Sequence, residues 1–135
     1  MPELEHIAQV IGEWVKKAEN DLKAAAYTLN MDKDCPVDTV CFHAQQCVEK
    51  IMKALLISAE IVPPKSHDLL RLHELLVPVY RHWMPNLEHL RFLNSASVSF
   101  RYPGDSASRD DAGEAYSICC RFRESLLALF QNPSE

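Results

Sequence analysis

The residues of this chain whose types best suit chemistry stand together in the segment Arg101-Tyr102-Pro103-Gly104-Asp105. An arginine presents five N–H donors in a planar fork that matches a phosphate group, and a tyrosine ring offers a face on which a base can stack. Proline fixes φ and glycine permits a positive φ, so a helix cannot run through this segment. We therefore expect a bend that presents Arg101 and Tyr102 side by side.

Further polar residues could complete a phosphate-binding site with this bend: Lys50, Lys53, Ser66 and His67. Ser66 has the position of a helix N-cap, and the free backbone amides of a helix start attract anions. The same residues have plainer explanations, in which the lysines form a solvated face and Ser66 only caps its helix. Arg101 could likewise do no more than bond the last carbonyls of the preceding helix. The spacing alone leaves both interpretations open.

The histidines and cysteines form no recognisable metal or nucleophile motif. Zinc needs three or four converging ligands, and the sequence contains no CxxC, HxxxH or HExxH pair. His43 and Cys47 are four residues apart, but buried cysteines and surface histidines are far commoner than ligands. GxSxG, Walker and GxGxxG motifs are absent too. We predict no metal and no cofactor, and the sequence does not favour catalysis by cysteine or serine.

Five amphipathic helices must position these residues. Apolar side chains recur every three or four residues over five stretches: about 3–30, 36–59, 66–82, 85–98 and 108–130. The chain has only three glycines, which argues against a turn-rich β sandwich. We predict an all-α fold, an up-and-down bundle of four to five helices in one domain that spans residues 1–135.

The helix expected at 36–59 is apolar over more than half of its circumference. It is therefore either the central helix of the bundle or a helix that also meets a second subunit. Because this helix is too apolar for one buried side in a small bundle, we expect part of it to meet a second subunit and predict a homodimer.

Composition and charge exclude several classes of protein. The net charge is −5, so no global basic field attracts nucleic acid, and any RNA contact must come from a local cluster. Five cysteines, an odd number, do not suggest a disulfide framework, and the first residues lack the pattern of a secretory signal. We expect a soluble cytoplasmic protein.

Four segments in this order carry a resemblance to a known family: WVKKAENDL at 14–22, CFHAQQCVEKIMKAL at 41–55, SHDL at 66–69 and RYP at 101–103. Together they resemble the HEPN family (higher eukaryotes and prokaryotes nucleotide-binding), in its small stand-alone prokaryotic type. The resemblance implies a helical bundle, usually a homodimer. It also implies pairing with a minimal nucleotidyltransferase, often as a toxin–antitoxin-like module, and a surface that faces a nucleotide or RNA.

Many HEPN proteins are metal-independent ribonucleases, whose signature is an arginine followed, after four to six residues, by a histidine. After Arg101 this window holds Ser106, Ala107 and Ser108, and no other arginine is followed by such a histidine. The missing histidine favours a binding and partner-docking module over an enzyme. The alternative is a ribonuclease that uses Arg101 with a non-standard partner such as His67.

Overall fold

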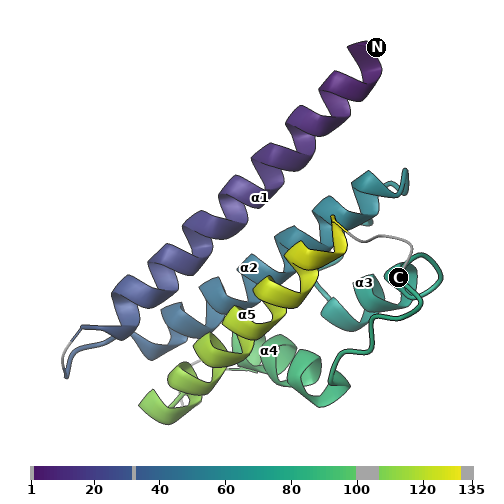
Figure 1. Cartoon of the computed structure of the whole chain (residues 1–135). Helices are drawn as coiled ribbons and strands as arrows, with labels where there is room; N and C mark the ends of the chain where they lie inside the picture. Colours follow the sequence, from purple (N-terminus) through teal and green to yellow (C-terminus); the bar gives the residue numbers. More distant parts are fainter. Residues whose placement is uncertain (1, 32, 100–106, 132–135) are drawn as a thin grey trace.

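The computed structural model describes residues 2–31, 33–99 and 107–131, and within them it confirms the all-α prediction (Figure 1). The five helices are α1 (Pro2–Leu29), α2 (Val37–Ser58), α3 (Leu69–Leu76), α4 (Leu87–Ser99) and α5 (Arg109–Leu129). The sequence placed α1, α2 and α5 to within one residue at each end. The segment Arg101 to Asp105 lies outside the described residues.

Helix α2 is the centre of the bundle. It contacts every other helix, most extensively α1, which runs antiparallel beside it (Figure 1). Its fully buried residues form the middle of the core: Val40, Cys41, Ala44, Cys47, Val48, Ile51, Met52, Ala54, Leu55 and Leu56. The wide apolar surface of α2 is therefore covered within one chain, and it no longer argues for a second subunit.

Helix α3 is shorter than the sequence suggested, and the predicted N-cap is wrong. The cap is Asp68, whose side chain accepts from the Leu70 N–H at 2.9 Å. The Ser66 hydroxyl instead accepts from the Asp68 N–H at 3.1 Å, in the turn before the helix. The helix ends at Leu76. Val77 still has a helical conformation, and its N–H donates to the His73 carbonyl at 3.0 Å, but Pro78 has no N–H with which to continue the ladder.

Helix α4 also begins later than expected, at Leu87 and not at Pro85. The Asn86 side-chain oxygen accepts from the Glu88 N–H at 2.9 Å, which satisfies one of the free amides at the helix start. The short polar Asn86 side chain sets this boundary, and Pro85 only precedes it.

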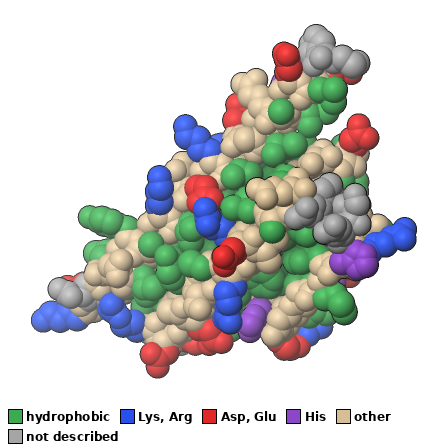
Figure 2. Space-filling model, viewed as in Figure 1, with side chains coloured by type: hydrophobic (Ala, Val, Ile, Leu, Met, Phe, Trp, Pro, Cys, Tyr) green, Lys and Arg blue, Asp and Glu red, His purple; other side chains and the backbone are tan. Residues whose placement is uncertain are grey.

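Acidic and basic side chains are interspersed on the face of the molecule that Figure 2 shows, so this face has no continuous basic field. None of the helices in the described residues is both long and apolar enough to span a membrane.

Candidate functional site

A buried carboxylate, that of Glu49 on α2, organises the polar residues at one side of the bundle. Its side chain is only 3% exposed. Four groups lie within hydrogen-bonding distance of its oxygens: Gln45 Nε2 at 3.1 Å, Gln46 Nε2 at 3.3 Å, Lys53 Nζ at 3.2 Å and His67 Nδ1 at 3.0 Å. Burial of a charge is costly unless it is paired and hydrogen-bonded, and Glu49 meets both conditions.

Helix geometry explains the contacts that Glu49 makes within α2. Gln45, Glu49 and Lys53 are spaced four residues apart, so they follow one stripe of α2. The contact between Glu49 and His67 depends on the segment before α3, which lies beside α2 and brings His67 to the carboxylate. Gln45 donates to the His67 carbonyl at 2.9 Å, so His67 is held at its backbone as well as at its ring.

His67 combines a fixed ring with an accessible one. A carboxylate can only accept hydrogen bonds, so the Nδ1 that faces Glu49 carries a proton. The His67 side chain is 78% exposed, and its Nε2 has no partner within the described parts of the chain. An imidazole oriented by a carboxylate in this way can exchange a proton or a hydrogen bond at Nε2.

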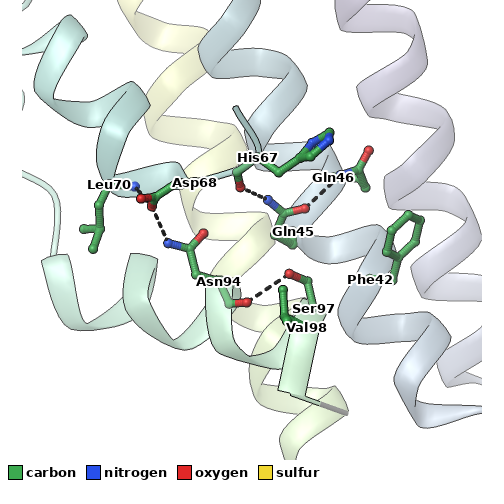
Figure 3. A pocket seen from close by; sticks show the side chains of 9 residues that line it. All are labelled: Phe42, Gln45, Gln46, His67, Asp68, Leu70, Asn94, Ser97 and Val98. Atoms are coloured by element: carbon green, nitrogen blue, oxygen red, sulfur yellow. Dashed lines mark hydrogen bonds between the residues drawn. The ribbon is translucent and has the colours of Figure 1, made fainter. Parts of the chain in front are cut away.

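A pocket of about 580 Å³ opens beside this network (Figure 3). Three elements line it: α2 with Phe42, Gln45 and Gln46; α3 and the turn before it with His67, Asp68 and Leu70; and α4 with Asn94, Ser97 and Val98. The volume lies in the range that small-molecule sites commonly occupy. An aromatic ring, apolar side chains and several polar groups thus face one open space.

The structure brings two of the predicted phosphate-binding residues together, since Lys53 and His67 meet at Glu49. Lys50 points to another partner, the Asp21 carboxylate of α1 at 2.5 Å, which His43 also contacts at 2.7 Å. Arg101 and Tyr102 lie outside the described residues.

The helix-start amides that the sequence suggested for an anion are already engaged. Leu69 N–H donates to Asn94 Oδ1 at 3.0 Å, and Leu70 N–H donates to Asp68. An anion at this helix start would have to displace both side chains. The Ser66 hydroxyl contributes to the turn, and among the described residues no hydrogen bond joins it to the side chain of Lys53 or His67.

Sequence reasoning did not assign roles to Glu49, Gln45, Gln46 or Asn94. One signal was available, because polar residues at every fourth position on an otherwise apolar helix indicate a buried polar stripe. Asn94 has no comparable signal, since its role depends on the packing of α4 against α3.

No group of three or more potential metal ligands exists among the described residues. Three of the five cysteines, Cys41, Cys47 and Cys119, are fully buried. Burial, with a smaller contribution from nearby Asp111 and Asp38, raises the pKa of Cys41 to about 11. Such thiols remain protonated near neutral pH and are poor nucleophiles.

Comparisons with known proteins agree with this architecture. The structure resembles the crystal structure of TT1696 from Thermus thermophilus, with a TM-score of 0.71, 22% identity and coverage of 87% of this chain and 96% of that one. It also resembles ST0689, described as an archaeal HEPN homologue, with a TM-score of 0.64, 22% identity and coverage of 87% and 95%. No curated protein matches the sequence. The model of the HEPN domain matches residues 11–129, and the chain therefore belongs to the HEPN family.

Proposed function

We propose that residues 1–135 form a single HEPN module of the cytoplasm that binds a nucleotide or RNA in the pocket beside His67. The observation that carries the proposal is an open pocket of about 580 Å³ with an imidazole that a buried carboxylate holds in place. The Phe42 ring lines the same pocket and offers an apolar surface to a base. A base would occupy the pocket, and its phosphate would lie at the rim.

Arg101 is our candidate for the phosphate contact. Lys50 and Lys53 already pair with Asp21 and Glu49, so a phosphate would have to compete with these carboxylates. In this arrangement Arg101 pairs with the phosphate, Tyr102 stacks or donates a hydrogen bond, and His67 offers Nε2 to the ligand.

Isothermal titration calorimetry with ATP and with a short single-stranded RNA tests this function. We expect heat of binding for the wild type, and an affinity at least tenfold lower for Arg101→Ala and His67→Ala, since each loses a hydrogen bond to a charged group. The matched control is His82→Ala, which removes an exposed histidine outside the pocket and should bind like the wild type. Absence of binding in the wild type with both ligands would refute the proposal.

The second candidate function is a metal-independent ribonuclease in which Arg101 stabilises the phosphate and His67 exchanges the proton. The contact between Glu49 and His67 favours it, because a carboxylate that fixes Nδ1 leaves Nε2 free for acid–base work. RNA cleavage by the purified protein in EDTA should then be lost in both Arg101→Ala and His67→Ala, and retained in His82→Ala. Cleavage that survives His67→Ala would rule out this mechanism.

Membership of the HEPN family also supports two proposals about assembly: a homodimer, and docking of a minimal nucleotidyltransferase in a toxin–antitoxin-like system. Because α2 is covered within the chain, the subunits would have to meet through exposed apolar residues, such as Tyr27, Val62 and Met84. Size-exclusion chromatography with light scattering should show a dimer at micromolar concentration. Co-expression with a nucleotidyltransferase encoded beside this chain should yield a complex that survives purification.

A further inference from the structure

In the hydrogen-bond network around the pocket, each side-chain amide has one possible orientation, because the buried Glu49 carboxylate accepts hydrogen bonds and cannot donate them. The network therefore has a definite direction, from donor to acceptor. We infer from this direction that the pocket selects a base with an exocyclic amino group, such as adenine or cytosine. The inference rests on the proposed nucleotide-binding function and adds the class of base to it.

The direction begins at Glu49 and passes through two glutamines. Gln45 Nε2 lies between two acceptors, Glu49 Oε1 at 3.1 Å and the His67 carbonyl at 2.9 Å, so the Gln45 amide can point only one way. The Gln45 Oε1 then accepts from Gln46 Nε2 at 2.9 Å, and the same Nε2 also faces Glu49 Oε1 at 3.3 Å.

This order leaves an acceptor at the pocket. Both hydrogens of Gln46 Nε2 are directed inward, to Gln45 and Glu49. The Gln46 Oε1 therefore has no partner in the portion of the chain that the structure describes, and Gln46 is a lining residue of the pocket (Figure 3).

On the opposite wall of the pocket, the orientations of Asn94 and Asp68 are fixed in the same way, by hydrogen bonds to backbone N–H groups. Asn94 Oδ1 accepts from the Leu69 N–H at 3.0 Å, so Asn94 Nδ2 faces Asp68 Oδ1 at 2.8 Å (Figure 3). Asp68 Oδ1 also accepts from the Leu70 N–H. The second oxygen, Asp68 Oδ2, has no partner among the residues that the structure describes, so this wall also presents an acceptor, here with negative charge.

Two acceptor walls favour a ligand group that donates. Adenine and cytosine carry an amino group where hypoxanthine and uracil carry a carbonyl oxygen. The amino group can donate to Gln46 Oε1 or Asp68 Oδ2. A carbonyl oxygen in that place would face oxygen atoms, would lose its hydrogen bonds with water, and would be repelled by the carboxylate.

Calorimetry with two matched pairs of nucleotides tests the inference: CMP against UMP, and AMP against inosine monophosphate. Each pair differs mainly at the amino or carbonyl position. In the wild type we expect the amino-bearing nucleotide to bind about tenfold more tightly in both pairs, the size of one well-placed hydrogen bond.

Two variants locate the effect. Asp68→Asn keeps an oxygen for the helix cap and replaces the outward oxygen by an N–H donor, so the preference for the amino-bearing nucleotide should shrink or reverse. Gln46→Met keeps the shape of the side chain without its acceptor, and should reduce the preference by about threefold, a partial loss of one hydrogen bond. Gln9→Met, on the exposed face of α1, is the matched control and should keep the wild-type preference. Circular dichroism checks that each variant is folded.

The outcomes separate the two levels of the proposal. Equal affinities within both pairs, or a preference that folded Asp68→Asn and Gln46→Met retain in full, would overturn the inference and leave nucleotide binding in place. If none of the four nucleotides binds the wild type, the selectivity is overturned, and the proposed function fails with it when ATP and the short RNA do not bind either.

Discussion

At the scale of single residues, Glu49 decides more than its position in the sequence suggests. Its carboxylate is almost fully buried and forms an ion pair with Lys53, whose side chain is itself only 8% exposed. A buried pair of this kind contributes little net stability, but the removal of one partner leaves an uncompensated charge. Glu49 is therefore both a structural residue and the residue that orients the pocket.

We predict that Glu49→Gln lowers the free energy of unfolding by about 3 kcal/mol, because it leaves the Lys53 ammonium buried without a counter-charge. Urea denaturation measures the change. The double variant Glu49→Gln with Lys53→Met should recover part of the loss, since it removes the unpaired charge. The control Glu124→Gln, on an exposed part of α5, should be near neutral. A cost as small for Glu49→Gln as for the control would contradict this account of the pair.

His73 gives stability a dependence on pH. Its ring lies 5.6 Å from the Trp83 ring, and burial lowers the pKa of His73 from 6.5, although the charge of Glu74 opposes this shift. The unfolded chain therefore takes up a proton at higher pH than the folded chain, and stability falls as the pH drops below about 6.5. Urea denaturation at pH 7.5 and at pH 5.5 should show a smaller loss for His73→Gln than for the wild type. Identical losses would show that His73 does not contribute.

At the scale of the helices, short polar side chains set the boundaries and prolines only limit them. Asp68 and Asn86 start α3 and α4 by accepting from backbone amides, two to three residues after the positions that the sequence suggested. Ser66, Asp68 and Asn86 are all good caps by type. Which of several neighbouring residues becomes the cap depends on which side chain lies close to a free backbone N–H of the first turn. For this reason the starts of α3 and α4 were less predictable than the start of α1.

Helix α5 begins with a capping box at Ser108, the residue where the sequence placed the approximate start of this helix. The Ser108 hydroxyl accepts from the Asp111 N–H at 3.1 Å, and the Asp111 carboxylate accepts from the Ser108 N–H at 3.0 Å. We predict that Ser108→Ala lowers the free energy of unfolding by about 1 kcal/mol in thermal or urea denaturation. Ser117→Ala, at an exposed position inside the same helix, should cost nothing because alanine is the better helix former. A similar effect at both serines would exclude a capping role.

At the scale of the whole molecule, the position of α2 explains its composition. Four helices surround it, so 13 of its 22 residues are buried within one chain. The apolar pattern alone fits a central helix and a dimer interface equally well, because both cover the same kind of surface. Only the packing of α1, α3, α4 and α5 decides between them.

We predict that Leu55→Ala, in the middle of this core, lowers the free energy of unfolding by about 3 kcal/mol, through lost apolar burial and the cavity left behind. Leu4→Ala makes the same chemical change at a side chain that is 60% exposed, and should cost less than about 0.5 kcal/mol. Urea denaturation of both variants provides the comparison. Comparable costs at the two sites would mean that Leu4 is covered in solution, as a subunit interface near the start of α1 would require.

The sequence by itself determined the helices, their approximate ends, the all-α class and the resemblance to the HEPN family, because these follow from local periodicity and from short motifs. It also showed that no histidine follows Arg101 at the spacing of the family's ribonucleases. The tertiary structure alone decided which polar groups meet. Lys50 binds Asp21, Lys53 and His67 share Glu49, and Asn94 reaches Asp68. Most of these contacts join residues 18 to 29 positions apart, and they form only when separate helices pack together.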